Sequence, residues 1–281
     1  MSGALFVVGG AEDRKGAKLI LRQFTETAGG RAARLLVIAS ASTIPDEVLA
    51  EYEAAFTDIG VGHLDPCFQR SRSEVDTPEL LAKLEDATGV YFTGGDQLRL
   101  VSVLGGTAFA RRLRERHAEG LPLGGTSAGA SAMSAVMIGR GQGRRTPRVS
   151  AVRLAPGLGV LPEIIVDQHF RERDRLGRLI TAVIENPGHL GFGIDEDTAF
   201  IVDPDGMVSV SGRGTLTIVD GHELTGSSIA EGKDNQPLAY AGIRLHGLAP
   251  GWRFDTNTRT VHQPGDTTVE LPERNAPAVA R

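Results

Sequence analysis

Cysteine is almost absent from this sequence: Cys67 is the only one among 281 residues. A single cysteine excludes an intrachain disulfide and a metal site built from several cysteines, and it is compatible with a reducing compartment. No apolar run approaches the roughly 18 residues that span a bilayer. The first residues also lack the basic segment and long apolar stretch of a signal peptide. We therefore expect a cytoplasmic protein with no membrane partner.

An excess of basic residues is lacking too. Lys and Arg together number 30 against 35 Asp and Glu, which gives a formal net charge of −5. Because nucleic-acid binding depends on neutralising phosphates, this charge argues weakly against a nucleic-acid partner. The apolar fraction of 41% and the charged fraction of 23% are those of an ordinary globular protein, which needs no metal or disulfide to stabilise its core.

Short aliphatic runs alternate with longer amphipathic stretches over the first two-thirds of the chain. The runs predict strands at 5–8, 35–39, 63–68, 89–92, 121–123 and 164–166, and the amphipathic stretches predict helices at 15–28, 45–59, 78–86, 107–119 and 174–185. Strands that alternate with helices in this way are typical of βαβ units. The expected fold class is therefore α/β, with a mainly parallel sheet that is covered by helices on both faces.

From about Gly191 the sequence pattern changes to that of short strands joined by turns. The pattern predicts strands at 191–195, 199–202, 207–210 and 215–219. No linker precedes them, so we expect an antiparallel C-terminal extension of the same sheet and a single domain over residues 1–262. Residues 263–281 contain three prolines and few large apolar residues, and we expect them to form a flexible tail.

The most informative segment is Gly125-Thr126-Ser127-Ala128-Gly129, which follows a strand and precedes a helix of small residues. In this context Gly-x-Ser-x-Gly predicts a nucleophile elbow, a tight turn that exposes the serine hydroxyl above a helix N-terminus. The alternative is a glycine-rich turn that happens to contain a serine. As a nucleophile Ser127 needs a base, and the base needs an acid to orient it.

His169 is the best candidate for the base because it follows the apolar strand at 164–166, at the edge where ligands bind in open parallel sheets. A structural, hydrogen-bonded histidine is the alternative. Three carboxylates end a later strand, Asp195, Glu196 and Asp197, and spacing does not choose among them. The order serine, histidine, acid excludes the usual α/β-hydrolase arrangement, in which the acid precedes the histidine.

Two further segments are candidates for substrate contacts. The turn at Gly94-Gly95 follows a strand, so the N–H groups of Gly95 and Ala128 could together stabilise an oxyanion. Arg173, Arg175 and Arg178 follow His169, and guanidinium groups near a catalytic histidine suit the capture of a carboxylate. The alternatives are an ordinary turn and a solvated helix face.

The turn at Gly9-Gly10 lies at the end of the first strand, but acidic residues follow it, Glu12 and Asp13. A pyrophosphate would be repelled there, so we expect no dinucleotide. No cofactor and no metal are expected elsewhere.

Five segments together resemble the cyanophycinases, in the same order and at similar spacing. These segments are 9–13, 92–100, 125–129, 166–170 and 193–198, and the resemblance extends from about Leu5 to Val219. It implies a flavodoxin-like fold related to class I glutamine amidotransferases, with serine in place of the elbow cysteine. It also implies hydrolysis of cyanophycin, a polyaspartate that carries arginine on each β-carboxyl, to β-aspartyl-arginine dipeptides.

The resemblance assigns roles to particular residues. Ser127 corresponds to the nucleophile, His169 to the base and Glu196 to the acid. The positions that line the family's substrate pocket are Gln97, Asp167, Gln168, Arg173, Arg175 and Arg178. We expect the arginines to hold a terminal carboxylate and so to enforce cleavage from the chain end, and Asp167 to receive a guanidinium group. The family also implies a homodimer that uses no metal.

One segment departs from the family pattern: residues 139–148 are rich in arginine, and we expect them to form a rim of the site. A basic rim suits polyaspartate carboxylates better than guanidinium groups. Two alternatives to cyanophycin hydrolysis therefore stay open, an aspartyl dipeptidase with a small closed pocket and a catalytically silent peptide-binding protein.

Overall fold

Nine strands form the larger of two main sheets in the computed structural model, which describes residues 2–143 and 146–265. Five of them are parallel, in the order β1 (Leu5–Val8), β5 (Leu123–Thr126), β4 (Gly89–Phe92), β2 (Arg34–Ile38) and β3 (His63–Cys67). Antiparallel strands continue the sheet beyond β1: β10 (Thr198–Val202), β11 (Met207–Gly212), β16 (Arg253–Asp255) and β17 (Thr260–His262). The parallel block and the antiparallel extension confirm the predicted α/β fold class.

Helices cover both faces of the parallel block, because successive side chains of a strand point to opposite faces. On one face, α1 (Leu19–Thr27) and α2 (Pro45–Ile59) pack over buried residues such as Phe6 and Tyr91. On the other face, the adjacent residues Val7 and Phe92 are buried. The helices there are α3 (Pro78–Asp86), α4 (Gln97–Leu104), α5 (Ala108–Ala118) and α6 (Ala128–Met133).

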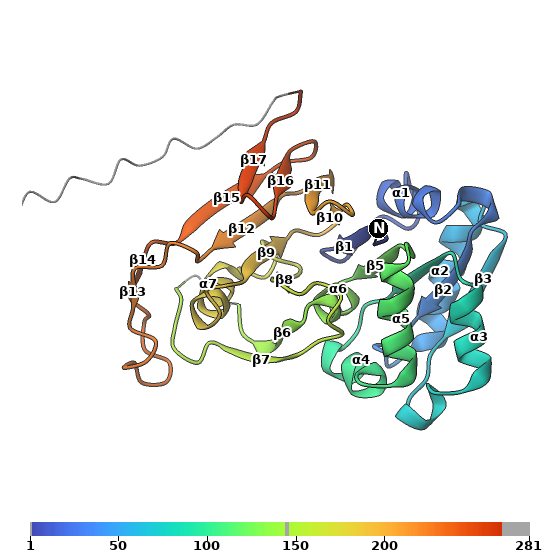
Figure 1. The fold of residues 1–281 in the computed structure, drawn as a ribbon, viewed down its shortest axis with the longest axis horizontal. Helices are drawn as coiled ribbons and strands as arrows, with labels where there is room; N and C mark the ends of the chain where they lie inside the picture. Colours follow the sequence, from blue (N-terminus) through green and yellow to red (C-terminus); the bar gives the residue numbers. More distant parts are fainter. Residues whose placement is uncertain (1, 144–145, 266–281) are drawn as a thin grey trace, which may run out of the picture.

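A second sheet of four strands corrects one expectation. Its order is β15 (Arg244–Leu248), β12 (Leu216–Asp220), β9 (Leu190–Ile194) and β8 (Ile164–Asp167), and only β8 and β9 are parallel. The strands at 164–166, 191–195 and 215–219 were expected in the larger sheet. The prediction was wrong because hydrophobic pattern identifies a strand but not its pairing partner. Figure 1 shows this sheet on the other side of β1 from β2 and β3, with α7 (Leu176–Glu185) against it.

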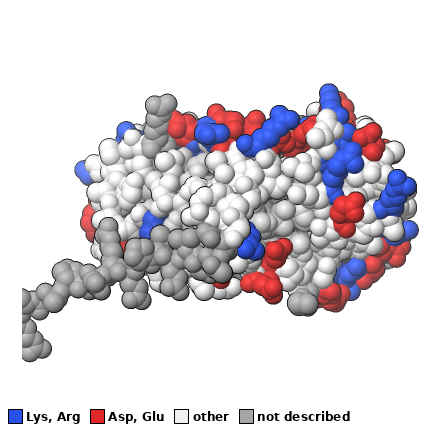
Figure 2. Space-filling model, turned by 90° about the horizontal axis from the view of Figure 1, so that it is seen from above, with Lys and Arg blue, Asp and Glu red and all other residues white. Residues whose placement is uncertain are grey.

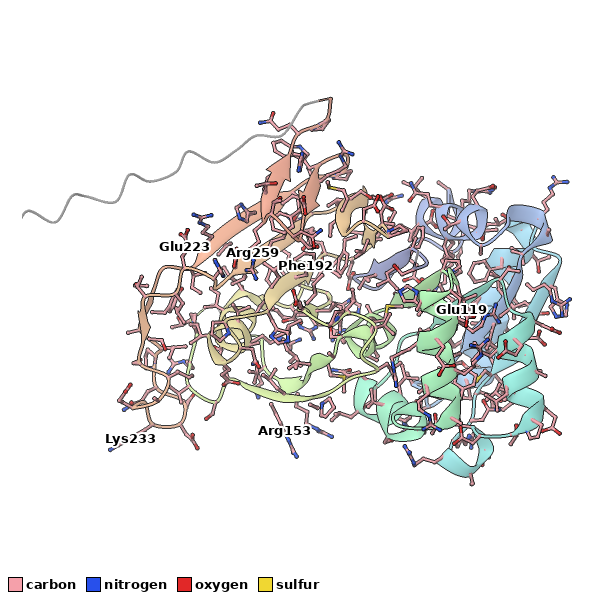
Figure 3. All side chains as sticks on the ribbon, viewed as in Figure 1. Glu119, Arg153, Phe192, Glu223, Lys233 and Arg259 are labelled. Atoms are coloured by element: carbon pink, nitrogen blue, oxygen red, sulfur yellow. The ribbon has the colours of Figure 1, made fainter. Side chains whose placement is uncertain are left out.

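The two sheets share one core. Phe192 of β9 lies in the interior (Figure 3), where its ring meets those of Phe200 and Phe254 of the larger sheet edge-on, with ring centroids 4.9 and 6.2 Å away. Such edge-to-face pairs contribute about 0.5–1.5 kcal/mol beyond their buried area. This shared core holds the carboxyl end of β8 close to the larger sheet.

Several elements were not predicted from the sequence. These are α4, the pair β6 (Val136–Gly141) and β7 (Val152–Pro156), the pair β13 (Gly226–Ser227) and β14 (Tyr240–Ala241), the strands β15, β16 and β17, and the short 3-10 helices at Gly30–Ala32 and Arg72–Glu74. β5 lies two residues later than expected and contains Gly124, where a Cβ atom would come within 2.5 Å of the Tyr91 ring. Close packing therefore requires glycine at this position, although glycine has a low propensity for strands.

The predicted tail at 263–281 lies outside the described residues, except for 263–265, and the single domain over 1–262 stays a prediction. In the described ranges no helix is both long and apolar enough to cross a membrane. Figure 2 shows acidic and basic side chains mixed along the margins of one face, around a broad area without charge.

Candidate active site

Ser127 lies at a sharp turn between β5 and α6. Its backbone has φ 52° and ψ −111°, which is a strained conformation for a residue with a side chain. The flanking glycines are packed against backbone: a Cβ on Gly125 would lie 2.9 Å from the carbonyl carbon of Gly129, and one on Gly129 would lie 2.5 Å from the Phe92 oxygen. The turn is therefore possible only with glycine on both sides of the serine.

Three side chains from separate segments form one hydrogen-bonded row. Ser127 Oγ lies 2.9 Å from His169 Nε2, and His169 Nδ1 lies 2.5 Å from Glu196 Oε1. Ser127 follows β5 of the larger sheet, His169 follows β8 of the second sheet, and Glu196 lies in the turn between β9 and β10. The structure thus brings together the three residues that the resemblance named, from strands of both sheets.

The neighbours of Glu196 have other partners. Asp195 is buried and accepts hydrogen bonds from the backbone N–H and the hydroxyl of Thr215. Asp197 Oδ2 lies 3.1 Å from Arg213 Nε. Of the three carboxylates left open by spacing, only Glu196 contacts the imidazole.

The end of β1 holds all three segments in place. The Val8 oxygen accepts from Ser127 N–H at 3.0 Å, the Gly9 oxygen from His169 N–H at 2.8 Å, and the Gly10 oxygen from Asp197 N–H at 2.9 Å. Three successive carbonyl groups therefore each fix one segment of the row.

Gly10 also packs directly against the imidazole. Its φ is 105°, and a Cβ atom there would lie 2.4 Å from His169 Cε1. The sequence analysis considered Gly9-Gly10 only as a nucleotide site and missed this role. Two glycines directly after a buried strand were the available signal, since they permit such close approach.

Burial lowers the pKa of His169 below its usual value of 6.5, and the nearby positive charges of Arg173 and Arg175 act in the same direction. The hydrogen bond that His169 Nδ1–H donates to Glu196 opposes this shift without cancelling it. His169 is therefore neutral at neutral pH, which is the state required for accepting a proton.

The Gly94-Gly95 turn faces the serine from the end of β4. A Cβ on Gly94 would lie 3.5 Å from Ser127 Cβ and 4.0 Å from Ser127 Oγ. Within the described ranges, the N–H groups of Gly95 and Ala128 donate to no protein acceptor. Both predicted oxyanion donors are thus available, and their role stays a prediction.

The three arginines of the predicted pocket have different environments. Arg178 is buried and binds both carboxylate oxygens of buried Asp167, at 2.7 Å from Nε and 2.5 Å from Nη2. Arg175 is also buried, and its Nη1 donates to the Gln168 side chain at 3.0 Å and to Asp167 at 3.3 Å. Burial lowers the pKa of Arg175 to about 10. Arg173 is exposed and forms no ion pair with any described residue.

The arginine-rich segment reaches this cluster through its backbone. Arg178 Nη1 donates to the Gly141 oxygen at 2.7 Å, and Gln97 Nε2 donates to the oxygens of Ile138 and Gly139 at 3.0 and 3.3 Å. Residues 139–143 therefore border the site, as expected of a rim, whereas 144–145 lie outside the described residues.

A buried carboxylate below the elbow was not predicted as part of the site. Glu12 is 4% exposed, and it accepts from Thr126 Oγ1 at 2.6 Å, from Tyr91 at 3.3 Å and from Tyr52. Because Thr126 precedes Ser127, this network fixes the strand end that carries the serine. The acidic residues after Gly10 gave the signal, but the burial of Glu12 was not readable from the sequence.

No group of three or more His, Cys, Asp or Glu in the described part of the chain is arranged to hold a metal ion. The row of Ser127, His169 and Glu196 is complete without one. Its arrangement matches that required for acyl transfer, with a hydroxyl, a neutral imidazole and an orienting carboxylate.

Comparison with known proteins agrees with this geometry. Residues 5–210 match the model of peptidase family S51. A cyanophycinase from Nostoc sp. (strain PCC 7120) is 44% identical over 259 residues, 92% of this chain and 87% of that protein. A cyanophycinase from Geminocystis herdmanii is 39% identical over 271 residues, 96% of this chain and 98% of that protein.

Solved structures show the same fold at lower identity. A peptidase from an acI-B1 Actinobacterium has a TM-score of 0.64 at 21% identity, covering 89% of this chain and 97% of that one. A putative peptidase E from Listeria monocytogenes EGD-e has a TM-score of 0.51 at 19% identity, covering 76% and 100%. The resemblance drawn from the motifs is confirmed: this chain belongs to peptidase family S51.

Proposed function

We propose that this protein is a serine exopeptidase that hydrolyses cyanophycin to β-aspartyl-arginine dipeptides. The observation that carries the proposal is the hydrogen-bonded row of Ser127, His169 and Glu196, in a chain 44% identical to a cyanophycinase. Proteins of this name are similar over nine-tenths of the chain, which favours cyanophycin over a short aspartyl dipeptide as the substrate.

In the first half of the reaction, Ser127 Oγ attacks the carbonyl carbon of the scissile peptide bond while His169 Nε2 accepts the hydroxyl proton. The N–H groups of Gly95 and Ala128 stabilise the negative charge that develops on the carbonyl oxygen. Glu196 stabilises the imidazolium through Nδ1. Collapse of the intermediate breaks the C–N bond, His169 gives its proton to the leaving amine, and an acyl-enzyme remains on Ser127.

In the second half, water attacks the acyl carbon and gives its proton to His169. The tetrahedral intermediate then releases Ser127 Oγ, which takes the proton back from His169. The products are a free carboxylate and the regenerated enzyme. Because the lowered pKa of His169 keeps the imidazole neutral between turnovers, each half begins with a competent base.

We propose that the substrate pocket contains the polar residues beside this row, which are Gln97, Asp167, Gln168, Arg173, Arg175 and Arg178. Of the charged residues in this set only Arg173 is exposed, and we propose that it binds the terminal carboxylate of the substrate. Asp167 already binds two arginines, so its function in this proposal is to position them and not to receive a guanidinium group from the substrate. We further propose that the protein is a cytoplasmic homodimer.

The test is incubation of the purified protein with insoluble cyanophycin, followed by mass spectrometry of the soluble products. We expect β-aspartyl-arginine from the wild type. Ser127→Ala should lower turnover by about 10⁴-fold or more, because the nucleophile is lost, while binding of the polymer persists. An intact polymer after incubation with the wild type would contradict the proposed substrate, and near-normal turnover by Ser127→Ala would contradict the proposed nucleophile.

A further inference from the structure

A cavity lined mainly by polar side chains lies beyond the Gly94-Gly95 turn, on the side away from Ser127. It has a volume of about 230 Å³ and is formed where β2 and β3 end and α4 passes. The residues that determine its chemistry are Ser40, Ser42, Thr43, Arg70, Arg99 and Ser102. None of them has a part in the reaction described above.

The cavity is close to the catalytic serine because one turn separates them. Gly94 faces Ser127, as described, whereas Gly95 packs on the opposite side against the Ala41 backbone. A Cβ atom on Gly95 would lie 2.2 Å from the Ala41 oxygen, and that oxygen accepts from Asp96 N–H at 2.9 Å. The loop that forms one wall of the cavity is therefore bonded to the turn that faces the nucleophile.

Two guanidinium groups of this cavity form no ion pair with an acidic residue in the described part of the chain. Arg99 is exposed, and its side chain forms no ion pair or hydrogen bond with any residue that the structure describes. Arg70 is also exposed and forms no ion pair with a described residue. Glu74 accepts a hydrogen bond from the Arg70 backbone N–H, and the more distant Arg70 charge helps to lower the pKa of Glu74. Unpaired guanidinium groups on neighbouring segments are suited to a carboxylate or a similar anion.

The buried groups beside the cavity add no negative charge. Ser40 is 5% exposed, and its hydroxyl interacts with the neighbouring thiol of Cys67. That thiol is buried and stays protonated, because burial raises its pKa to about 12.

We propose that this cavity is a second substrate-binding site, which takes a carboxylate from a repeat of the polymer other than the one being cut. This inference rests on the proposed function. Each repeat of cyanophycin carries a free arginyl carboxylate, so a chain whose terminal repeat is being cut at Ser127 presents further carboxylates along its remaining repeats. Arg70 and Arg99 bind one of them.

The experiment compares soluble oligomers of two and five β-aspartyl-arginine repeats, with Arg99→Gln and Arg70→Gln as variants. We expect each variant to raise KM for the five-repeat oligomer about tenfold, because a charge-assisted hydrogen bond is lost. The kcat for both oligomers and the KM for the two-repeat oligomer should stay unchanged. Arg31→Gln is the matched control, since it removes an exposed arginine before the amino-terminal end of β2, whereas the cavity lies at the carboxyl ends of β2 and β3.

An unchanged KM for the long oligomer, or an equal change for both oligomers, would overturn the second site. Sulfate provides a further test, because it should raise the wild-type KM for the long oligomer and leave that of Arg99→Gln unaffected. Stimulation of two-repeat cleavage by sulfate would instead indicate a free anionic effector and overturn the assignment to the substrate. Failure of the wild type to cut any oligomer would refute the proposed function itself, so the two failures are distinguishable.

Discussion

The arginines near Ser127 fall into two regions with opposite environments. In the first, Arg175 and Arg178 are buried and bind Asp167, so their charges are compensated within the protein. In the second, Arg173 and Arg99 are exposed and form no ion pair with described residues. Sequence pattern alone treats all four as equivalent cations.

The difference separates positioning from binding. A buried charge cannot release its partner without a large desolvation cost, so Arg178 holds Asp167, the end of β8 and the Gly141 backbone together. For an exposed, unpaired guanidinium group, the free-energy cost is small when a substrate carboxylate replaces the water around it. Arg175 and Arg178 therefore shape the loop that carries His169, whereas Arg173 and Arg99 are free to contact the substrate.

The largest expected effect follows from removing a charge of the first region. Arg178→Ala leaves Asp167 buried with only the longer contact to Arg175, and loss of one partner of a buried pair costs about 3–5 kcal/mol. Urea unfolding should show this loss in the free energy of unfolding. The control is Arg153→Ala on β7, an exposed arginine that projects outward (Figure 3), for which we expect a change within about 0.5 kcal/mol. Equal stability of the two variants would remove the distinction between the regions.

A change in the second region should affect binding instead. Arg173→Gln should leave the free energy of unfolding within about 0.5 kcal/mol of the wild type, because the side chain is exposed. The KM for the polymer or its oligomers should rise about tenfold through loss of the terminal carboxylate contact. The amount of product from internal cleavage should increase relative to the amount of terminal dipeptide. Strong destabilisation without a change in KM would show that Arg173 belongs with the buried pair.

Local signals predicted part of this arrangement. The helices α2 and α3 and the strands β1 and β4 have the bounds that the hydrophobic pattern and the initial prolines indicated. The elbow was predictable as well, because the two glycines around Ser127 meet a steric requirement that is visible in five residues. Such features depend on neighbours in the sequence.

Features that depend on distant neighbours were not predictable. The separation of β8 and β9 into a second sheet is decided by strand pairing, and the burial of Arg178 is decided by Asp167 and the β6–β7 pair. The role of Gly10 depends on contact with His169, which lies 159 positions later. Ser127 and His169 were therefore predicted from local pattern, the choice of Glu196 came from family resemblance, and the geometry of the three required the structure.

The smallest effect tests whether the exposed charge is felt at the imidazole. In the wild type, kcat/KM should decline on the acid side with a midpoint below pH 6.5. The reason is that burial and the charges of Arg173 and Arg175 lower the pKa of His169. Removing a positive neighbour makes protonation of the imidazole easier, so the pKa rises and Arg173→Gln should move the acid limb to higher pH. Arg153→Gln should leave it in place. A limb that does not move in Arg173→Gln would mean that the Arg173 charge is screened by solvent, so that Arg173 contributes to the site through substrate contact alone. A limb that moves to lower pH would contradict the direction assigned to the Arg173 charge.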